Sequence, residues 1–152
     1  LTDGKITFTS SGDEVKSFHV RDGHALKLAM RAGLAVALIT GRESPIVTRR
    51  ADELGIRLVF QGVLEKSKAL EALLAKTGFT PGQIAYMGDD VVDIPVLSAV
   101  GFGCAPSDAD PEVLARVSYV THARGGRGAV RELVQFILSA QGSWEGIIAR
   151  YI

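Results

Sequence analysis

Three aspartates lie within five residues, at Asp89, Asp90 and Asp93, shortly after an apolar run that ends at Met87. One aspartate here would need no explanation beyond helix capping, because a carboxylate is favourable near a helix N-terminus. Three carboxylates this close together repel one another unless a positive charge lies among them. Because Mg²⁺ is commonly held by one or two carboxylates and substrate phosphate, the cluster predicts a Mg²⁺ site with these three residues as candidate ligands. Capping alone is the alternative.

Lys66 follows the short apolar run Leu58–Phe60, at the expected start of a helix. A cation is electrostatically unfavourable at that end of a helix, so a solvated surface lysine, of which Lys68 is an example, is only one interpretation. The other interpretation is that Lys66 binds a phosphate group at the end of a strand.

Thr40, Gly41 and Arg42 directly follow the longest apolar run, Leu34–Ile39. Thr40 could cap the next helix, but Ser44 is better placed to be its N-cap. The Thr40 hydroxyl is then free to bind a ligand, with Gly41 beside it. Arg42 is a candidate fork for an anion, and a solvated loop arginine is the alternative.

A glycine-rich segment with cations, Gly125-Gly126-Arg127-Gly128, lies between Arg124 and Arg131. Glycine leaves a segment mobile and lets its backbone approach a ligand closely. Arginine side chains suit a sugar carboxylate or a phosphate. Arg127 and Arg131 are therefore candidate substrate-binding residues, and a solvated loop that merely starts the last helix is the alternative.

The composition of the chain narrows the class of protein. Its 152 residues, 47% of them apolar, fit one domain. Lysine plus arginine and aspartate plus glutamate both number 17, and this zero net charge argues against a nucleic-acid partner. The single cysteine, Cys104, indicates a reducing, cytoplasmic compartment. No apolar run has the length of a membrane span and no signal peptide is visible, so we expect no membrane partner.

Apolar runs and helical periodicities alternate along most of the chain. Residues 5–20 predict a β-hairpin, with strands Ile6–Thr9 and Glu14–Val20 around a Gly-containing turn. The predicted strands after it are Leu34–Ile39, Leu58–Phe60, Ile84–Met87, Phe102–Ala105 and Tyr119–Thr121. The predicted helices begin after Asp22 and continue with Ser44–Leu54, Glu65–Thr77, Val91–Val100 (interrupted at Pro95), Pro111–Val117 and Ala129–Ala140, before a flexible tail at 142–152.

This alternation predicts a single α/β domain over residues 1–152, with a doubly wound, mostly parallel, Rossmann-like sheet. In such sheets ligands bind beyond the carboxyl ends of the strands. The candidate residues named above follow three strand ends, so we expect them to meet at one edge.

Seven stretches of the sequence, in order and reaching to about Leu138, resemble the haloacid dehalogenase superfamily of phosphotransferases. Within it they resemble the small, capless 3-deoxy-D-manno-octulosonate 8-phosphate phosphatase subfamily. The stretches are Leu1-Thr2-Asp3-Gly4-Lys5-Ile6, Val20-Arg21-Asp22-Gly23, Ile39-Thr40-Gly41-Arg42, Gln61-Gly62, Met87-Gly88-Asp89-Asp90 with Asp93-Ile94-Pro95, Ala105-Pro106-Ser107-Asp108-Ala109, and Gly125-Gly126-Arg127-Gly128-Ala129-Val130-Arg131-Glu132.

The resemblance implies a role for each residue of the predicted edge. Thr40 would be the second-motif hydroxyl that binds the phosphoryl group, and Lys66 the third-motif lysine that neutralises nucleophile and phosphate. Asp89 would be the fourth-motif Mg²⁺ ligand, with Asp90 and Asp93 as neighbouring support. The implied reaction is Mg²⁺-dependent hydrolysis of an acidic sugar phosphate, 3-deoxy-D-manno-octulosonate 8-phosphate.

The resemblance also implies a homotetramer without a large cap domain. In that family the hairpin and the C-terminal tail help to close a neighbouring subunit's site. Arg127 and Arg131 would then contact substrate in a neighbouring subunit.

One part of the family pattern has no counterpart in the chain. The first motif, Asp-x-Asp, carries the nucleophile and the general acid/base and would precede Leu1. We therefore expect an N-terminally truncated version that lacks the nucleophile, one metal ligand and a central strand. Glu65 also stands where the family commonly has aspartate.

Three other functions are alternatives to a sugar-acid phosphatase. One is an inactive scaffold or regulatory subunit of the same fold, and another is a phosphatase for a related nonulosonate 9-phosphate. A receiver-type signalling domain also gathers acids, threonine and lysine around Mg²⁺. Its acidic pair comes first, however, whereas here Thr40 and Lys66 precede Asp89.

Overall fold

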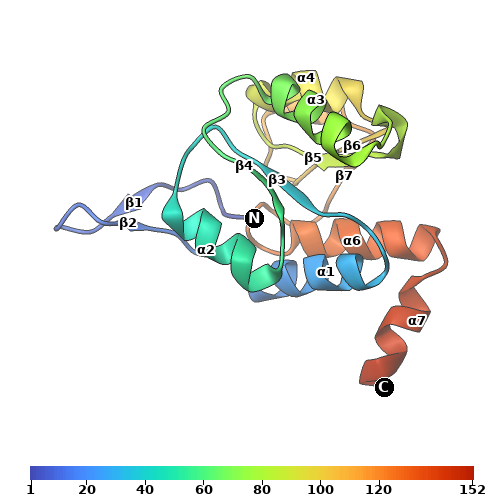
Figure 1. The fold of residues 1–152 in the computed structure, drawn as a ribbon. Coiled ribbons are helices and arrows are strands. Elements are labelled where there is room, and N and C mark those ends of the chain that lie inside the picture. Colours follow the sequence, from blue (N-terminus) through green and yellow to red (C-terminus); the bar gives the residue numbers. More distant parts are fainter.

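The hairpin is the first element of the structure, a computed structural model that describes all of residues 1–152. Strands β1 (Thr7–Phe8) and β2 (Glu14–Val15) pair antiparallel and project from the body of the molecule (Figure 1). The predicted hairpin is confirmed, but its strands are shorter than the polarity pattern indicated. The prediction of a strand up to Val20 is wrong, because Val20 already begins the first helix.

Five further strands are parallel to their hydrogen-bonded neighbours, in two separate groups. The first group pairs β3 with β4, and the second has the order β5-β6-β7. Their bounds are β3 (Ala37–Ile39), β4 (Leu58–Phe60), β5 (Ala85–Met87), β6 (Phe102–Ala105) and β7 (Tyr119–Val120). The apolar run from Leu34 is only half strand, and at its start the Leu34 N–H donates to the Ala29 carbonyl at the end of the preceding helix, at 3.0 Å, instead of to a neighbouring strand.

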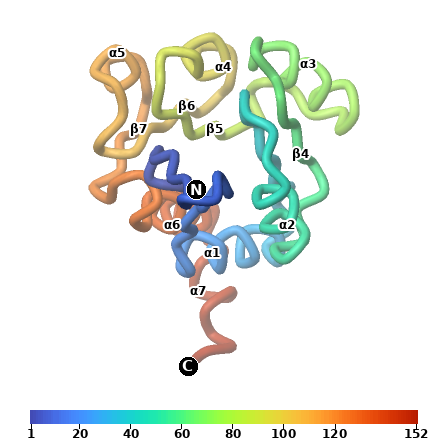
Figure 2. Tube along the Cα trace, turned by 90° about the vertical axis from the view of Figure 1, so that its left-hand side faces the viewer, coloured from blue at the N-terminus to red at the C-terminus, as the bar shows by residue number.

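Helices cover both faces of these strands, which confirms the doubly wound α/β class. Helices α3, α4 and α5 lie on one side, and α1, α2 and α6 on the other (Figures 1 and 2). The bounds are α1 (Val20–Arg31), α2 (Pro45–Leu54), α3 (Lys66–Thr77), α4 (Ile94–Ala99), α5 (Pro111–Leu114), α6 (Ala129–Ala140) and α7 (Trp144–Ile148). No helix has the length and apolar character needed to cross a membrane.

Helix ends follow the local chemistry of the sequence. Gly55 and Gly78 end α2 and α3 with φ of 83° and 74°, a left-handed conformation that glycine adopts without steric cost. Pro95 lies in the first turn of α4 and therefore begins that helix rather than interrupting it. Helix α5 ends three residues before the predicted Val117. One reason is that the Glu112 carbonyl accepts a hydrogen bond from the Arg116 guanidinium at 2.7 Å.

The main core lies between α1, α2 and α6, where the apolar spacing of each helix turns one face inward. Fully buried members include Ala25, Leu28, Ile56 and Leu138. A smaller cluster around Val113 lies under α4 and α5. Cys104 is fully buried in β6.

The C-terminal residues are ordered, contrary to the flexible tail that the sequence indicated. Helix α7 is followed by a 3₁₀ turn, and Trp144 is buried in the main core. The Tyr151 hydroxyl accepts a hydrogen bond from Arg31 at 2.7 Å and lies 3.1 Å from the ring of His24. An aromatic anchor at each end therefore fixes the segment to α1 and α6.

Candidate functional site

Thr40 and Arg42 lie in a tight turn at the carboxyl end of β3. The Thr40 N–H donates to the Phe60 carbonyl at 2.9 Å, so the strand pairing with β4 continues into the turn. The Thr40 hydroxyl oxygen accepts a hydrogen bond from the Arg42 N–H at 3.2 Å. Because that oxygen acts as acceptor, its own proton is free to be donated to a ligand.

Gly62 completes this turn from the β4 side. Its N–H donates to the Arg42 carbonyl at 3.4 Å, and its φ is 68°. A Cβ atom at this position would lie 2.6 Å from a Glu43 carboxylate oxygen. The left-handed backbone conformation therefore favours glycine here, whereas the Glu43 side chain is flexible enough to move away from a Cβ atom.

Asp93 is the centre of the acidic cluster, and only 1% of the residue is exposed. One of its oxygens accepts hydrogen bonds from Lys66 Nζ at 2.6 Å and from the Tyr86 hydroxyl at 2.5 Å. The other oxygen accepts from the backbone N–H groups of Asp89 and Asp90 at 3.2 and 3.3 Å. Both oxygens are thus engaged by protein donors, which favours a supporting role for Asp93 over direct ligation of a metal.

The same contacts fix Lys66 at this edge of the sheet. Its side chain is 14% exposed, so the solvated alternative does not describe it. Gly88 makes the arrangement possible, because a Cβ atom there would lie 2.4 Å from the Asp93 Cβ atom. The sequence analysis missed Tyr86, whose pKa is raised by burial and by its hydrogen bond to Asp93.

Asp89 and Asp90 differ in what their carboxylates contact. The Asp90 carboxylate accepts a hydrogen bond from the Val91 N–H at 2.7 Å and caps the 3₁₀ turn Val91–Asp93, so capping accounts for its position. The Asp89 carboxylate has no hydrogen-bond donor in the protein. Loss of hydration raises the pKa of Asp89, and the negative charge of Asp93 raises it further.

A divalent cation fits the Asp89 carboxylate, because it would satisfy a charge that the protein leaves unpaired. The cluster does not form a complete metal site of its own. No group of three or more His, Cys, Asp or Glu side chains is arranged to hold a metal ion. A Mg²⁺ ion at Asp89 would therefore complete its coordination with phosphate, water or other groups, as is usual for this ion.

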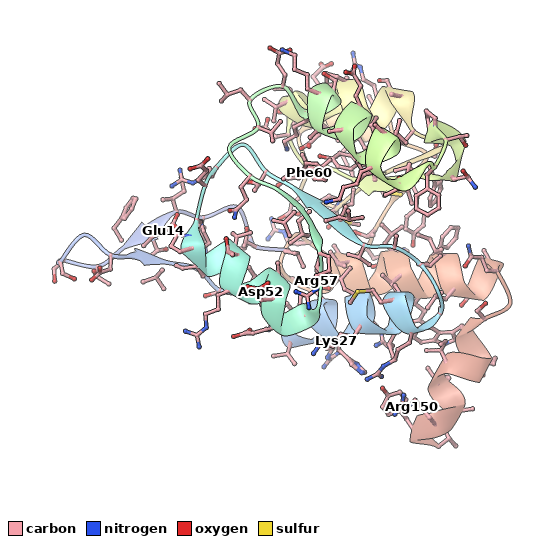
Figure 3. All side chains as sticks on the ribbon, viewed as in Figure 1. Glu14, Lys27, Asp52, Arg57, Phe60 and Arg150 are labelled. Carbon is pink, nitrogen blue, oxygen red and sulfur yellow. The ribbon has the colours of Figure 1, made fainter.

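Glu14 joins the hairpin to the Thr40 turn (Figure 3). Its carboxylate accepts hydrogen bonds from Lys16 at 2.7 Å, from the Ser44 hydroxyl at 2.7 Å and from Arg42 at 3.2 Å. These contacts, the one from Lys16 first, lower the pKa of Glu14. Ser44 does occupy the N-cap position of α2, but its hydroxyl binds Glu14 and makes no capping hydrogen bond.

Arg127 and Arg131 point to different surroundings. Arg127 lines an open cavity of about 270 Å³ whose other walls are formed by charged residues and Gly125. Those charged residues are Asp3, Lys5, Asp108 and Arg124. The Arg131 guanidinium lies 4.8 Å from the ring centroid of Trp144, in a cation–π contact with α7.

The cavity and the acidic cluster share one loop. Asp108 lines the cavity, and two residues later the Asp110 N–H donates to the Asp89 carbonyl at 2.9 Å. The acidic cluster and the cavity are therefore connected through residues 108–110.

Comparison with known proteins gives the same assignment as the motifs. A family model described as haloacid dehalogenase-like hydrolase matches residues 58–133. The 3-deoxy-D-manno-octulosonate 8-phosphate phosphatase of Haemophilus influenzae is 46% identical over 142 residues, which cover 93% of this chain and 79% of the relative. The chain is a haloacid dehalogenase-like hydrolase of this phosphatase subfamily.

Solved structures of the subfamily share the fold of the chain. The enzyme from Moraxella catarrhalis, solved with a magnesium ion, a phosphate ion and KDO, has a TM-score of 0.97 at 40% identity. The match covers all of this chain and 87% of that one. The Yersinia pestis enzyme has a TM-score of 0.94 at 43% identity, covering 95% of this chain and 78% of its own.

Four carboxylates that bind protein groups near the site were not predicted from the sequence. They are Glu14, Asp22, Asp108 and Glu132. Three of them, Asp22, Asp108 and Glu132, stand inside stretches that resemble the hydrolase family, which is the only signal in the sequence that could have found them.

Proposed function

We propose that the protein hydrolyses the phosphate ester of an acidic sugar, 3-deoxy-D-manno-octulosonate 8-phosphate, with Mg²⁺ as cofactor. The observation that carries the proposal is the fixed Lys66 ammonium beside the unpaired Asp89 carboxylate at one strand edge. The relatives support the choice of substrate, because a protein 46% identical carries that activity in its name. The Moraxella catarrhalis structure contains magnesium, phosphate and KDO together.

Each residue at this edge has its own role in phosphoryl transfer. Lys66 neutralises charge on the phosphoryl oxygens, and Asp93 holds its side chain in place. The Thr40 hydroxyl donates its proton to another phosphoryl oxygen. Such positioning and charge stabilisation supply most of the rate in phosphoryl transfer. The attacking aspartate that the family pattern implies would precede Leu1.

Asp89 would hold Mg²⁺, with Asp90 and Asp93 supporting the loop. The ion would neutralise charge that develops on the phosphoryl group. We expect the sugar carboxylate to be bound by Arg42, whose guanidinium pairs with Glu14 in this structure, and by Arg127, which lines the cavity. Arg131 stays a prediction for substrate binding, and in this structure its partner is Trp144.

A homotetramer in the cytoplasm completes the proposal. The hairpin exposes Ile6, Phe8 and Val15 at 53%, 60% and 44%, and a two-stranded hairpin is marginal without a packing partner. Association of these surfaces would bury them and bring Arg127 and Arg131 to a neighbouring site. Light scattering at micromolar concentration tests this, and a monomer would contradict it.

The activity is tested by measuring phosphate release by the full-length gene product from 3-deoxy-D-manno-octulosonate 8-phosphate. We expect turnover that EDTA abolishes and Mg²⁺ restores, and that is lost in Asp89→Asn. A nonulosonate 9-phosphate as parallel substrate distinguishes the related phosphatase. No turnover of either compound would support an inactive scaffold and overturn the proposal.

A further inference from the structure

Three carboxylates bind the backbone of the arginine loop, which we define as residues 122–131. They come from three separate places in the chain: Asp22 in α1, Asp108 in the loop after β6, and Glu132 in α6. Each accepts hydrogen bonds from backbone N–H groups of the loop. The glycines of this loop had suggested a mobile segment, whereas the structure shows it bound at its start, middle and end.

Asp22 binds the end of the loop and is fully buried. Its two oxygens accept hydrogen bonds from the N–H groups of Gly128 at 3.1 Å and Arg131 at 2.9 Å. These residues form the first turn of α6, so Asp22 caps that helix from α1, more than 100 residues earlier in the chain. The nearest ring nitrogen of His19 lies 3.7 Å away, too far for a hydrogen bond.

Glu132 binds the start of the loop. One oxygen accepts from the His122 N–H at 2.9 Å and from the Tyr119 hydroxyl at 3.1 Å, and the other accepts from the Ala123 N–H at 3.0 Å. Because Glu132 follows the loop and binds the first two residues of the loop, its side chain holds the two ends of the loop together.

Asp108 binds the middle of the loop. One oxygen accepts from the Gly125 N–H at 2.7 Å, and the other lies 3.6 Å from the Arg124 guanidinium. On its other side the loop meets the N-terminal residues, since a Cβ atom on Gly126 would lie 2.5 Å from the Thr2 carbonyl carbon. Arg127 is left in the wall of the cavity without an ion-pair partner.

We propose that Asp22, Asp108 and Glu132 are positioning residues that fix the arginine loop by its backbone and so present Arg127 to the acidic part of the substrate. The proposal rests on the proposed function, and it identifies the residues that set the preference of the enzyme for an acidic sugar phosphate. The three carboxylates accept hydrogen bonds from main-chain N–H groups and so orient the loop, while the charge of the Arg127 side chain is not neutralised. A preorganised guanidinium loses less conformational entropy when it binds a carboxylate.

Asp22→Asn is the decisive variant, because a fully buried side chain cannot touch substrate and can act only through the loop. Asparagine retains the size of aspartate, but its amide nitrogen cannot accept one of the two backbone hydrogen bonds. In the full-length protein we expect KM for 3-deoxy-D-manno-octulosonate 8-phosphate to rise about fivefold. KM and kcat for p-nitrophenyl phosphate, which has no carboxylate, should stay within about twofold.

Two further measurements separate positioning from a loss of stability. Amide exchange of Gly128 and Arg131, followed by NMR, should become about tenfold faster in Asp22→Asn. In an Arg127→Ala background, Asp22→Asn should cause no further rise in KM, because both changes remove the same contact. The control is Ile56→Val, which removes a buried methyl group of the main core far along the chain from the loop. This variant should lower the melting temperature without changing the ratio of the KM values for the two substrates.

The possible results divide clearly. Unchanged KM for the sugar acid in Asp22→Asn, or an equal change for both substrates, overturns the positioning role while the proposed function stands. The positioning role is also overturned if Asp22→Asn raises KM by the same factor in the Arg127→Ala background as in the unsubstituted protein. Absence of phosphatase activity in the unsubstituted protein overturns the proposed function instead. If Asp22→Asn does not fold, Glu132→Gln, whose side chain binds the loop backbone but does not line the cavity, takes its place in the same measurements.

Discussion

The edge that carries Lys66 and the arginine loop use carboxylates in opposite ways. At the edge, Asp93 pairs directly with the Lys66 side chain and with the Tyr86 hydroxyl. In the loop, Asp22 and Glu132 bind mainly backbone N–H groups and leave the Arg127 side chain unpaired. The first arrangement fixes the position of a charged atom. The second fixes the main chain and keeps the charged atom available for a ligand.

Replacing Lys66 by methionine should have the largest effect, because it removes the fixed charge at the edge and leaves Asp93 buried without it. We expect kcat to fall about 10²- to 10³-fold, the usual cost of removing one preorganised electrostatic group. Steady-state kinetics of the full-length protein measure this. The matched control is Lys68→Met on the exposed side of the same helix, where 68% of the side chain is exposed. Similar losses in both variants would show that the charge at Lys66 is not special.

Tyr86→Phe tests the same edge with a smaller change. The variant removes only the hydroxyl that donates to Asp93, and Lys66 keeps its partner. Tyr86 would act on the reaction only through Asp93 and Lys66, so only part of the roughly 1.5–3 kcal/mol of a hydrogen bond to a charged group should reach the transition state. We expect kcat to fall about three- to tenfold, with KM little changed. The ratio of kcat for sugar phosphate and for p-nitrophenyl phosphate should stay constant, because the edge serves both substrates. A selective loss for the sugar phosphate would contradict the division between edge and loop.

The sequence predicts the edge better than the loop, for a physical reason. Thr40, Lys66 and Asp89 follow strand ends, so the parallel topology predicts that they share one edge. In the structure Asp93 joins Lys66 to Asp89. The backbone contacts of Asp22 join residues more than 100 positions apart, and no local pattern records such a pairing. Side-chain directions are likewise absent from the sequence, which is why Ser44 was expected to cap α2 but binds Glu14 instead.

The lengths of the strands are also predicted only in part by the local sequence pattern. The runs Leu58–Phe60 and Phe102–Ala105 are strands over their whole predicted length. The run from Leu34 is apolar for two reasons, core packing at its start and strand pairing at its end, and a hydrophobicity pattern does not distinguish them. The order in the C-terminal residues comes from Trp144, whose burial depends on a tertiary contact with α6.

Glu132→Gln gives the smallest change and tests the loop through stability. Loss of hydration would raise the pKa of Glu132, but the hydrogen bonds from His122, Ala123 and Tyr119 outweigh it and lower the pKa to about 2. A carboxylate with a lowered pKa stabilises the fold above its unfolded pKa of 4.5, and this contribution is lost as the pH falls from 4.5 towards 2. With a side chain that is 25% exposed, we expect the variant to be less stable by about 1–2 kcal/mol at pH 7.

Urea unfolding at pH 7, 5 and 3 measures how this difference depends on pH. Glutamine does not titrate, so the gap between the two proteins should be constant from pH 7 to 5 and should narrow at pH 3. Glu112→Gln is the matched control, since Glu112 pairs with Arg116 on the surface of α5 and its side chain is 64% exposed. Exposed ion pairs contribute little, so that variant should stay within about 0.5 kcal/mol of the unsubstituted protein at each pH. Equal losses in the two variants, or a gap that does not narrow in acid, would show that the Glu132 carboxylate does not hold the loop through its charge.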